Sequence, residues 1–284
     1  MVFRKFRIFL GMIRFEHTVF ALPFAYIGAL MVDKRIPDLP DLFWITMAMA
    51  GARTAAMSLN RLIDLDHDAR NPRTSDRALP RGLIKIKEVW LYVLISLLVL
   101  MYSAYRLNPL AFKLAPLAVL VVCTYSYTKR FTWTCHMFLG MVLGIAPVGS
   151  WIAITGHFAL APIILGVGVL FWVAGFDIIY ACADYDFDRR VGLHSIPVRF
   201  GISKALQMSM AFHIIAPVLF LIVALLAHMG WLFLAGIGIA VVILFYQHTL
   251  VKPHDLSRAG TGFFNLNGIL SVVMLAFTLL DVLI

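Results

Sequence analysis

Long apolar runs alternate with short polar connections along nearly the whole chain. Each run is about 17 to 25 residues long, which is the length that an α-helix needs to cross the hydrocarbon core of a bilayer. The pattern therefore predicts an all-α membrane protein with about nine transmembrane helices. Their approximate ranges are 17–32, 41–62, 88–105, 109–127, 137–155, 159–182, 206–228, 231–249 and 263–282.

Two of the connections between these runs are long, 63–87 and 183–205. Long loops are where binding and catalytic residues concentrate, because a packed scaffold holds them in place at the surface. No linker or shift in composition divides the chain. We therefore expect a single integral-membrane domain over residues 1–284, with its helices in one bundle around a central cavity.

The first long connection begins with a cluster of oxygen-bearing side chains. Asn60, Asp64 and Asp68 are spaced four residues apart, so on a helix they lie on one face. Carboxylates this close repel one another unless a cation lies between them. Oxygen-only ligands select a hard ion, and Mg²⁺ usually completes its coordination with waters and substrate phosphates. This segment is a candidate Mg²⁺ site.

Arginines follow the first acidic cluster at Arg70, Arg73, Arg77 and Arg81. Guanidinium groups bind phosphate oxygens through paired N–H donors, so these residues are suited to surround a diphosphate. The competing interpretation is an acidic and basic loop that is merely solvated beside a membrane.

The second long connection repeats the arrangement. Asp177, Asp184 and Asp188 share one helical face, follow an apolar run and precede further arginines. Asp64 and Asp184 lie 120 residues apart, as do Asp68 and Asp188. An even number of predicted spans separates the two clusters, which indicates a parallel repeat whose halves face each other across the cavity. Charges so costly in a membrane are rarely duplicated by accident.

Composition places the chain in lipid. It is 62% hydrophobic, and its mean hydropathy is +0.90, which exceeds what a soluble domain of 284 residues needs. The net charge of +9 does not require nucleic acid, because the basic residues gather on one side of the predicted spans. The exceptions are Arg53, within a span, and a small group on the opposite side that comprises Lys34, Arg35, Arg106 and Lys113.

By the positive-inside rule this asymmetry predicts a multi-pass protein of the plasma (inner) membrane. The N-terminus and both acidic loops would then be cytoplasmic. The membrane lipid is the expected surrounding, and neither a nucleic acid nor a soluble protein partner is predicted.

Two further basic elements accompany the acidic clusters. Arg53 lies seven residues before Asn60 on the same predicted face. An arginine inside a span costs about 2.5 kcal/mol or more on insertion scales, so it is either paired with a carboxylate or used for a substrate. Lys129 and Arg130 follow the fourth predicted span, either as membrane anchors or as a rim over an anionic substrate.

These motifs resemble the UbiA superfamily of intramembrane prenyltransferases over nearly the whole chain. The NxxxDxxxD signature matches Asn60, Asp64 and Asp68. The RTxxRxLPxG signature is present as Arg73, Thr74, Arg77, Leu79, Pro80 and Gly82. The DxxYAxxDxxxD signature, in the form of the 4-hydroxybenzoate branch, is present as Asp177, Tyr180, Ala181, Asp184 and Asp188. The YPxxKRxT element is matched by Tyr125, Lys129, Arg130 and Thr132.

The resemblance implies a Mg²⁺-dependent enzyme that transfers a polyprenyl group from polyprenyl diphosphate to the ring of an aromatic quinone precursor in ubiquinone or menaquinone biosynthesis. The small aromatic acid acceptor would be of the 4-hydroxybenzoate type. Mg²⁺ would be held by Asn60, Asp64, Asp68, Asp184 and Asp188. Residues expected to contact substrates are Asn60, Arg53, Arg73, Arg77, Lys129, Arg130, Tyr180 and Arg14. Asp177 is the candidate to orient or deprotonate the phenol.

Departures from the 4-hydroxybenzoate pattern leave a second acceptor open. Ser126 and Ala78 stand where that branch usually has proline, and residues 14–23 lack its Asp-Lys-Pro. The segment 14–23 looks more like that of relatives that prenylate 1,4-dihydroxy-6-naphthoate in the futalosine route to menaquinone. A competitor of another class is a secondary transporter with an intramembrane cation site, although such sites usually lie near the bilayer midplane in broken helices.

Overall fold

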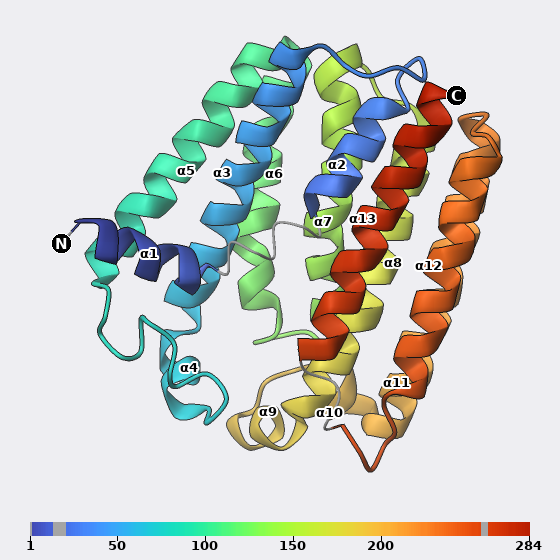
Figure 1. Ribbon diagram of the computed structural model, residues 1–284. Coiled ribbons are helices and arrows are strands. Elements are labelled where there is room, and N and C mark those ends of the chain that lie inside the picture. The colour runs from blue at the N-terminus through green and yellow to red at the C-terminus, as the bar shows by residue number, and fades with distance from the viewer. Residues whose placement is uncertain (1, 14–20, 257–260) are drawn as a thin grey trace.

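The computed structural model describes residues 2–13, 21–256 and 261–284, and these form an all-helical protein (Figure 1). The helices are α1 (Val2–Met12), α2 (Ala21–Leu30), α3 (Leu39–Ile63), α4 (Leu65–Arg70), α5 (Ile86–Leu107), α6 (Pro109–Thr128), α7 (Cys135–Thr155), α8 (Leu160–Ala183), α9 (Tyr185–Val191), α10 (Ile196–Phe200), α11 (Ile202–Leu226), α12 (Trp231–Thr249) and α13 (Thr261–Leu283).

Eight helices in the described part of the chain are long and apolar enough to cross a membrane. They are α3, α5, α6, α7, α8, α11, α12 and residues Asn265–Leu283 of α13. The span expected at 17–32 corresponds to α2, a helix of 10 residues, and residues 17–20 of that prediction lie outside the described residues. The prediction of a multi-pass, all-α membrane protein is confirmed.

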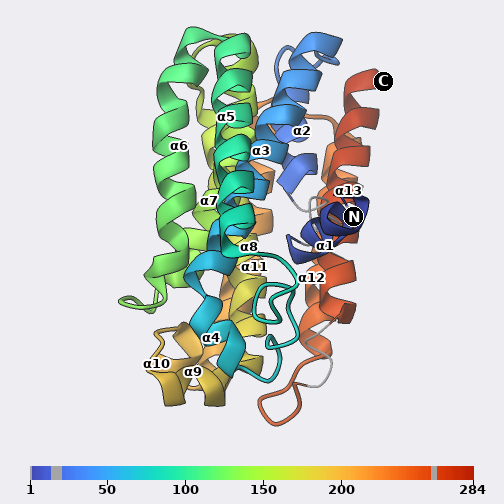
Figure 2. The same cartoon turned by 90° about the vertical axis from the view of Figure 1, so that its left-hand side faces the viewer.

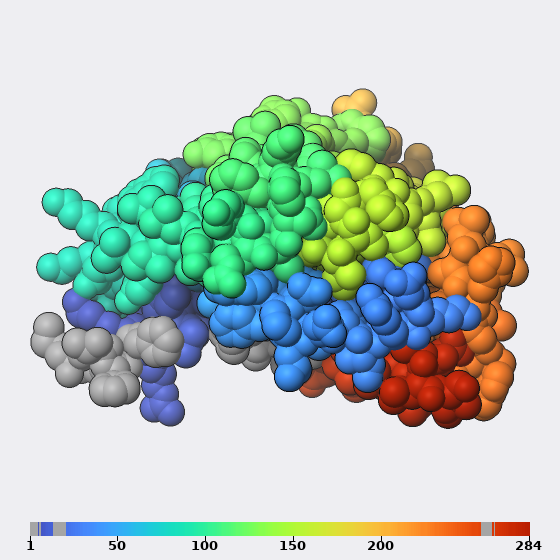
Figure 3. Space-filling view, turned by 90° about the horizontal axis from the view of Figure 1, so that it is seen from above, coloured from blue at the N-terminus to red at the C-terminus, as the bar shows by residue number. Residues whose placement is uncertain are grey.

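The short helices α4, α9 and α10 all lie at one end of the bundle, in the two long connections (Figures 1 and 2). The opposite end carries tight turns. One of them joins α5 to α6, where the Asn108 side chain accepts a hydrogen bond from the Ala111 N–H (2.9 Å) and Pro109 begins the next helix. Seen from above, the molecule is elongated, with α12 and α13 at the end away from α5 (Figure 3).

The largest apolar core gathers around α8, which has the most buried span of the eight. Trp172 on α8 packs against Phe24 of α2, and Phe24 contacts Phe220 of α11. Outward-facing leucines on α5 and α11, such as Leu98 and Leu225, are exposed because their solvent is lipid. Helix α1 lies across the bundle and packs on residues 79–89.

Small residues allow α7 and α8 to approach closely. A Cβ added to Gly144 would overlap the carbonyl oxygen of Gly166 on the facing helix. Such close contact lets helices in lipid gain van der Waals packing, since no hydrophobic effect drives them together. Gly149, on the same helix, has open space around its would-be Cβ.

Replacing Gly144 by valine is therefore expected to destabilise the bundle by about 1–3 kcal/mol, because the two helices must move apart. Thermal unfolding of the purified protein in detergent measures this. The matched control Gly149→Val adds the same atoms to the same helix and should leave the midpoint nearly unchanged. Equal midpoints for the two variants would contradict the close-packing account.

Candidate functional site

Both acidic clusters sit where a membrane helix bends. Asp64 separates α3 from α4 with φ −92° and ψ 5°, and Asp184 separates α8 from α9 with φ −100° and ψ 5°. Hydrogen bonds continue past each bend, since the Asp68 N–H donates to the Asp64 carbonyl (2.7 Å) and the Asp188 N–H to the Asp184 carbonyl (2.8 Å). The predicted single helical face is therefore bent at the same position in both repeats.

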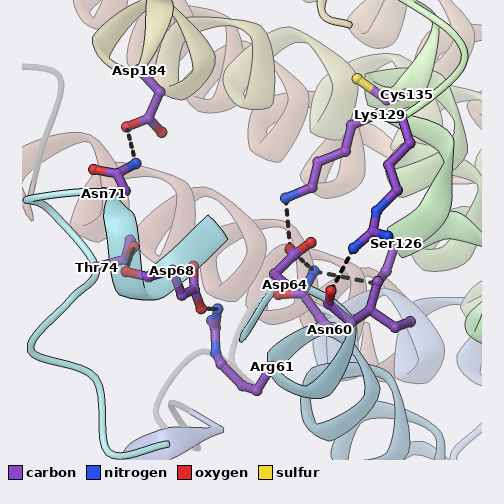
Figure 4. A network of polar contacts seen from close by, with 12 residues as sticks. Asn60, Arg61, Asp64, Asp68, Asn71, Thr74, Ser126, Lys129, Cys135 and Asp184 are labelled. Carbon is purple, nitrogen blue, oxygen red and sulfur yellow. Dashed lines mark hydrogen bonds and ion pairs between the residues drawn. The ribbon is translucent and has the colours of Figure 1, made fainter. Parts of the chain in front are cut away.

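Asp64 is the centre of the first cluster (Figure 4). It is buried, and its Oδ2 accepts hydrogen bonds from Lys129 Nζ (2.6 Å) and Asn60 Nδ2 (3.0 Å). Asn60 also contacts the Ser126 hydroxyl at 3.2 Å. The other oxygen of Asp64, Oδ1, is buried and has no hydrogen-bond partner among the residues that the structure describes. A buried carboxylate oxygen left in this state is costly, so it is suited to bind a ligand.

Asp68 is held by two arginines. Arg77 Nη1 lies 2.7 Å from each of its oxygens, and Arg61 Nη1 lies 3.6 Å from Oδ2. Both Asp68 and Arg61 are buried. The Thr74 hydroxyl donates to the Asp68 carbonyl (3.0 Å), so the loop after α4 folds back over the helix end.

Asp184, in the second cluster, is bound by the loop that follows the first. Arg73 forms a bidentate ion pair with it, with Nε 2.8 Å from Oδ1. Asn71 Nδ2 lies 3.5 Å from the same oxygen, and Figure 4 shows the Asn71 and Asp184 side chains facing each other. The hydrogen bond to Asp184 raises the pKa of Arg73. Burial and the nearby charge of Asp184 raise the pKa of Asp188 to about 6. The two predicted halves thus meet through side chains.

The segment after α6 connects both clusters. Lys129 pairs with Asp64, while its carbonyl accepts the His194 N–H (2.7 Å) from the loop after α9. Arg130 donates to the carbonyl of Ile63 at the end of α3. Both residues therefore do more than anchor the helix in the membrane.

The remaining predicted residues lie deeper or outside the described part. Asp177 is two turns before Asp184 on α8, and Tyr180 lies between them with its ring edge-on to Phe176. Arg53 is partly buried on α3. Arg14 lies outside the described residues.

Sequence reasoning missed Arg61, Asn71 and His136. Arg61 carried a usable signal, because a charge at the end of a predicted span is costly wherever it is buried. No pattern in the sequence pointed to His136, because its partner is 41 residues away along the chain. In the structure its Nδ1 lies 2.6 Å from Asp177 Oδ2.

The donor set fits Mg²⁺ in an open site. All five predicted ligands offer oxygen atoms, which a hard cation prefers, and within the described part of the chain Asp64 Oδ1 has no hydrogen-bond partner. Within the described residues, no three acidic, histidine or cysteine side chains converge into a closed cage. Instead, Lys129, Arg77 and Arg73 each bind a different carboxylate. A site of this kind can hold a metal together with an anion that contacts both the metal and the cations.

The chain matches one known protein family along most of its length. The model of the UbiA prenyltransferase family matches residues 21–269. The chain is 31% identical to the 4-hydroxybenzoate solanesyltransferase of Synechocystis sp., over 88% of this chain and 86% of that protein. It is 29% identical to the 4-hydroxybenzoate octaprenyltransferase of Methylobacillus flagellatus, over 81% and 79%.

Solved structures show the same fold. A UbiA homolog from Aeropyrum pernix in its apo form has a TM-score of 0.86 and 33% identity, over 94% of this chain and 98% of that one. A UbiA homolog from Archaeoglobus fulgidus bound to GPP and Mg²⁺ has a TM-score of 0.77 and 21% identity, over 98% and 100%. With its signatures placed at one end of this helical bundle, the chain belongs to the UbiA prenyltransferase family.

Proposed function

We propose that this enzyme transfers a polyprenyl group from its diphosphate to the ring of a 4-hydroxybenzoate-type quinone precursor. The observation that carries the proposal is a group of three ion pairs at one end of the bundle. In these pairs Lys129, Arg77 and Arg73 bind the first-repeat acids Asp64 and Asp68 and the second-repeat acid Asp184, respectively. Such a set binds a metal–diphosphate complex because the metal takes the carboxylates and the diphosphate takes the cations. The names of the relatives support the aromatic acceptor.

The chain's own residues would act on the two substrates in different ways. Asn60, Asp64, Asp68, Asp184 and Asp188 would hold Mg²⁺, which supplies Lewis-acid stabilisation of the departing diphosphate. Lys129, Arg73 and Arg77 would neutralise the negative charge that grows as the C1–O bond breaks. Arg130 and Tyr180 would border the same site, and Arg53 or Arg14 would bind the acceptor's carboxylate.

The apolar bundle would protect the reactive carbon. Ionisation of an allylic diphosphate leaves a carbocation that water would trap, so the chemistry requires a dry cavity. Once the diphosphate has left with the electron pair of the C1–O bond, a ring carbon of the acceptor bonds to C1, and one proton is then lost from that ring carbon. Asp177 is positioned on the α8 face that leads from Asp184 into the bundle, where it would accept a hydrogen bond from the phenol.

A second acceptor is favoured by one observation. Ser126, where the 4-hydroxybenzoate branch usually has proline, is buried and contacts Asn60 through its hydroxyl. Its departure from the pattern supports 1,4-dihydroxy-6-naphthoate as the alternative substrate. The transporter hypothesis is disfavoured, because the chain belongs to a family of prenyltransferases and both charge clusters lie at helix ends.

A prenyl-transfer assay on purified protein tests the function. Each acceptor is offered separately with Mg²⁺ and with geranyl to octaprenyl diphosphate as donor. We expect 4-hydroxybenzoate to be prenylated, and product from the dihydroxynaphthoate alone would assign the second acceptor. Absence of product from both would contradict the proposed function.

The acid at the first bend supplies the matched variants for this assay. Asp64→Asn should lower turnover at least about 100-fold, because it removes charge from the site that stabilises the leaving diphosphate. Asp66→Asn, which changes an exposed carboxylate two residues away, should retain turnover within about twofold. Equal losses in the two variants would show that the cluster at Asp64 has no special role.

Arg73 is expected to contribute to donor binding. Arg73→Gln should weaken the affinity for geranyl diphosphate with Mg²⁺ by about 10-fold or more, because a charge-assisted bond to phosphate is worth about 1.5–3 kcal/mol. Isothermal titration measures the dissociation constant. Arg199→Gln, which changes an exposed arginine of α10 outside this loop, is the control and should bind nearly as the wild type. Unchanged affinity in Arg73→Gln would contradict the assignment.

The asymmetry of basic residues supports a cytoplasmic location for both acidic loops, in the plasma (inner) membrane. An impermeant maleimide should label Asp76→Cys in inside-out vesicles but not in right-side-out vesicles. Asp38→Cys, at the opposite end of α3, should show the reverse pattern, and the wild type gives the background of the native cysteines. The opposite labelling of this pair would invert the proposed topology.

A further inference from the structure

The carboxylate of Asp177 is held by a histidine from the neighbouring helix. His136, in the first turn of α7, places its Nδ1 2.6 Å from Asp177 Oδ2 on α8. On the other side of the imidazole, Nε2 lies 3.3 Å from the backbone nitrogen of Ile196, the first residue of α10. One ring therefore connects two spans with the loop that follows the second acidic cluster.

The backbone contact determines which ring nitrogen carries the proton. The Ile196 N–H can only donate, so Nε2 must accept and cannot itself be protonated while this bond exists. Nδ1 then carries the hydrogen and donates it to Asp177. Both ring nitrogens are hydrogen-bonded, so His136 cannot take a further proton without losing its contact with α10. This arrangement is suited to orient a carboxylate and not to relay a proton.

Burial identifies which member of the pair can reach a substrate. The His136 side chain is 3% exposed, whereas the Asp177 side chain is 28% exposed. In the part of the chain that the structure describes, the hydrogen bond to Asp177 uses Oδ2. The second oxygen, Oδ1, is thus the one available to a hydroxyl group in the bundle.

The position of Asp177 along α8 suits contact with the acceptor and not with the diphosphate. Asp177 is seven residues before Asp184, which corresponds to about 10 Å along the helix axis. Arg73 and Asn71 bind the Asp184 carboxylate, at the end where the proposed function places the diphosphate. Asp177 lies toward the apolar interior, where the prenyl chain and the aromatic ring must meet.

We propose that His136 is a positioning residue for the acceptor: it holds one oxygen of Asp177 so that the other accepts a hydrogen bond from the acceptor's hydroxyl. That bond stabilises the positive charge that develops on the ring as the ring carbon attacks C1. The C1–O bond breaks with the electron pair leaving on diphosphate, the C–C bond forms, and the ring proton is taken up by the released diphosphate. The inference rests on the proposed function.

The competing explanation is a purely structural one. Ile196 packs with Ile178 and Cys182 of α8, so His136 could serve only to attach α10 to the bundle. The two explanations differ in what happens when Asp177 has already been changed. A positioning residue acts through Asp177, while a structural attachment acts without it.

A double-mutant cycle with His136→Ala and Asp177→Asn separates them. The acceptor's kcat/KM and the dissociation constant of geranyl diphosphate with Mg²⁺ are measured for the wild type, both single variants and the double variant. We expect His136→Ala to lower the acceptor's kcat/KM about 100-fold, as expected for a misplaced catalytic group. In the Asp177→Asn background the same change should cost less than about twofold. The affinity for the donor should change less than about twofold throughout.

A conservative variant provides the rescue. His136→Gln offers one N–H donor and one carbonyl acceptor at nearly the spacing of the two ring nitrogens, so it can bind both Asp177 and Ile196. It should recover most of the acceptor turnover lost in His136→Ala. If His136→Ala does not give folded protein, the cycle is run with His136→Phe, which keeps the ring volume, under the same criteria.

The inference is overturned if the loss caused by changing His136 is as large in the Asp177→Asn background as in the wild type. It is also overturned if donor affinity falls as much as acceptor turnover. Either result in an active wild type leaves the proposed function standing and makes His136 a structural attachment. A wild type that prenylates neither acceptor overturns the proposed function, and this inference with it.

Discussion

The structure depends on how buried carboxylates are neutralised at one end of a membrane bundle. Asp64 and Asp68 are buried, and a charge removed from water is tolerated only when it is paired and hydrogen-bonded. The cations that pair with the acids come from the loops and helix ends at this edge of the bundle, as in Lys129 with Asp64 and Arg73 with Asp184. These contacts fold the long connection after α4 back over the bundle and join the two repeats.

The same charges explain why such an end of the bundle can bind a metal and an anion together. Carboxylates and cations that satisfy each other without a ligand can exchange partners when both a divalent ion and a diphosphate are present. Under the proposed function the site is therefore preassembled, and little reorganisation of the chain is required. One buried acceptor is left over: among the described residues, Oδ1 of Asp64 has no hydrogen-bond partner.

The apolar part of the bundle positions this charged end. Helix α8 carries Asp177 and Asp184 on one face, and its other faces are buried against α7 and α11. Close contacts such as Gly144 against Gly166 bring α7 near enough for His136 to reach Asp177. Leucines elsewhere on the bundle are exposed to lipid, so the interior would be shielded from water, as the proposed carbocation chemistry would require.

The membrane spans, the repeat and the two acidic clusters could be predicted from the amino-acid pattern alone. Apolar runs of this length form membrane-spanning α-helices, because lipid offers no partner to unpaired backbone groups. Residues spaced by four share a face in any helix. The bends at Asp64 and Asp184 were not predicted, because side-chain periodicity does not report the backbone angles of a single residue. The contacts of Arg73 with Asp184 and of His136 with Asp177 result from tertiary packing. Partners 111 and 41 residues apart are chosen by how the helices pack, which no local pattern in the chain encodes.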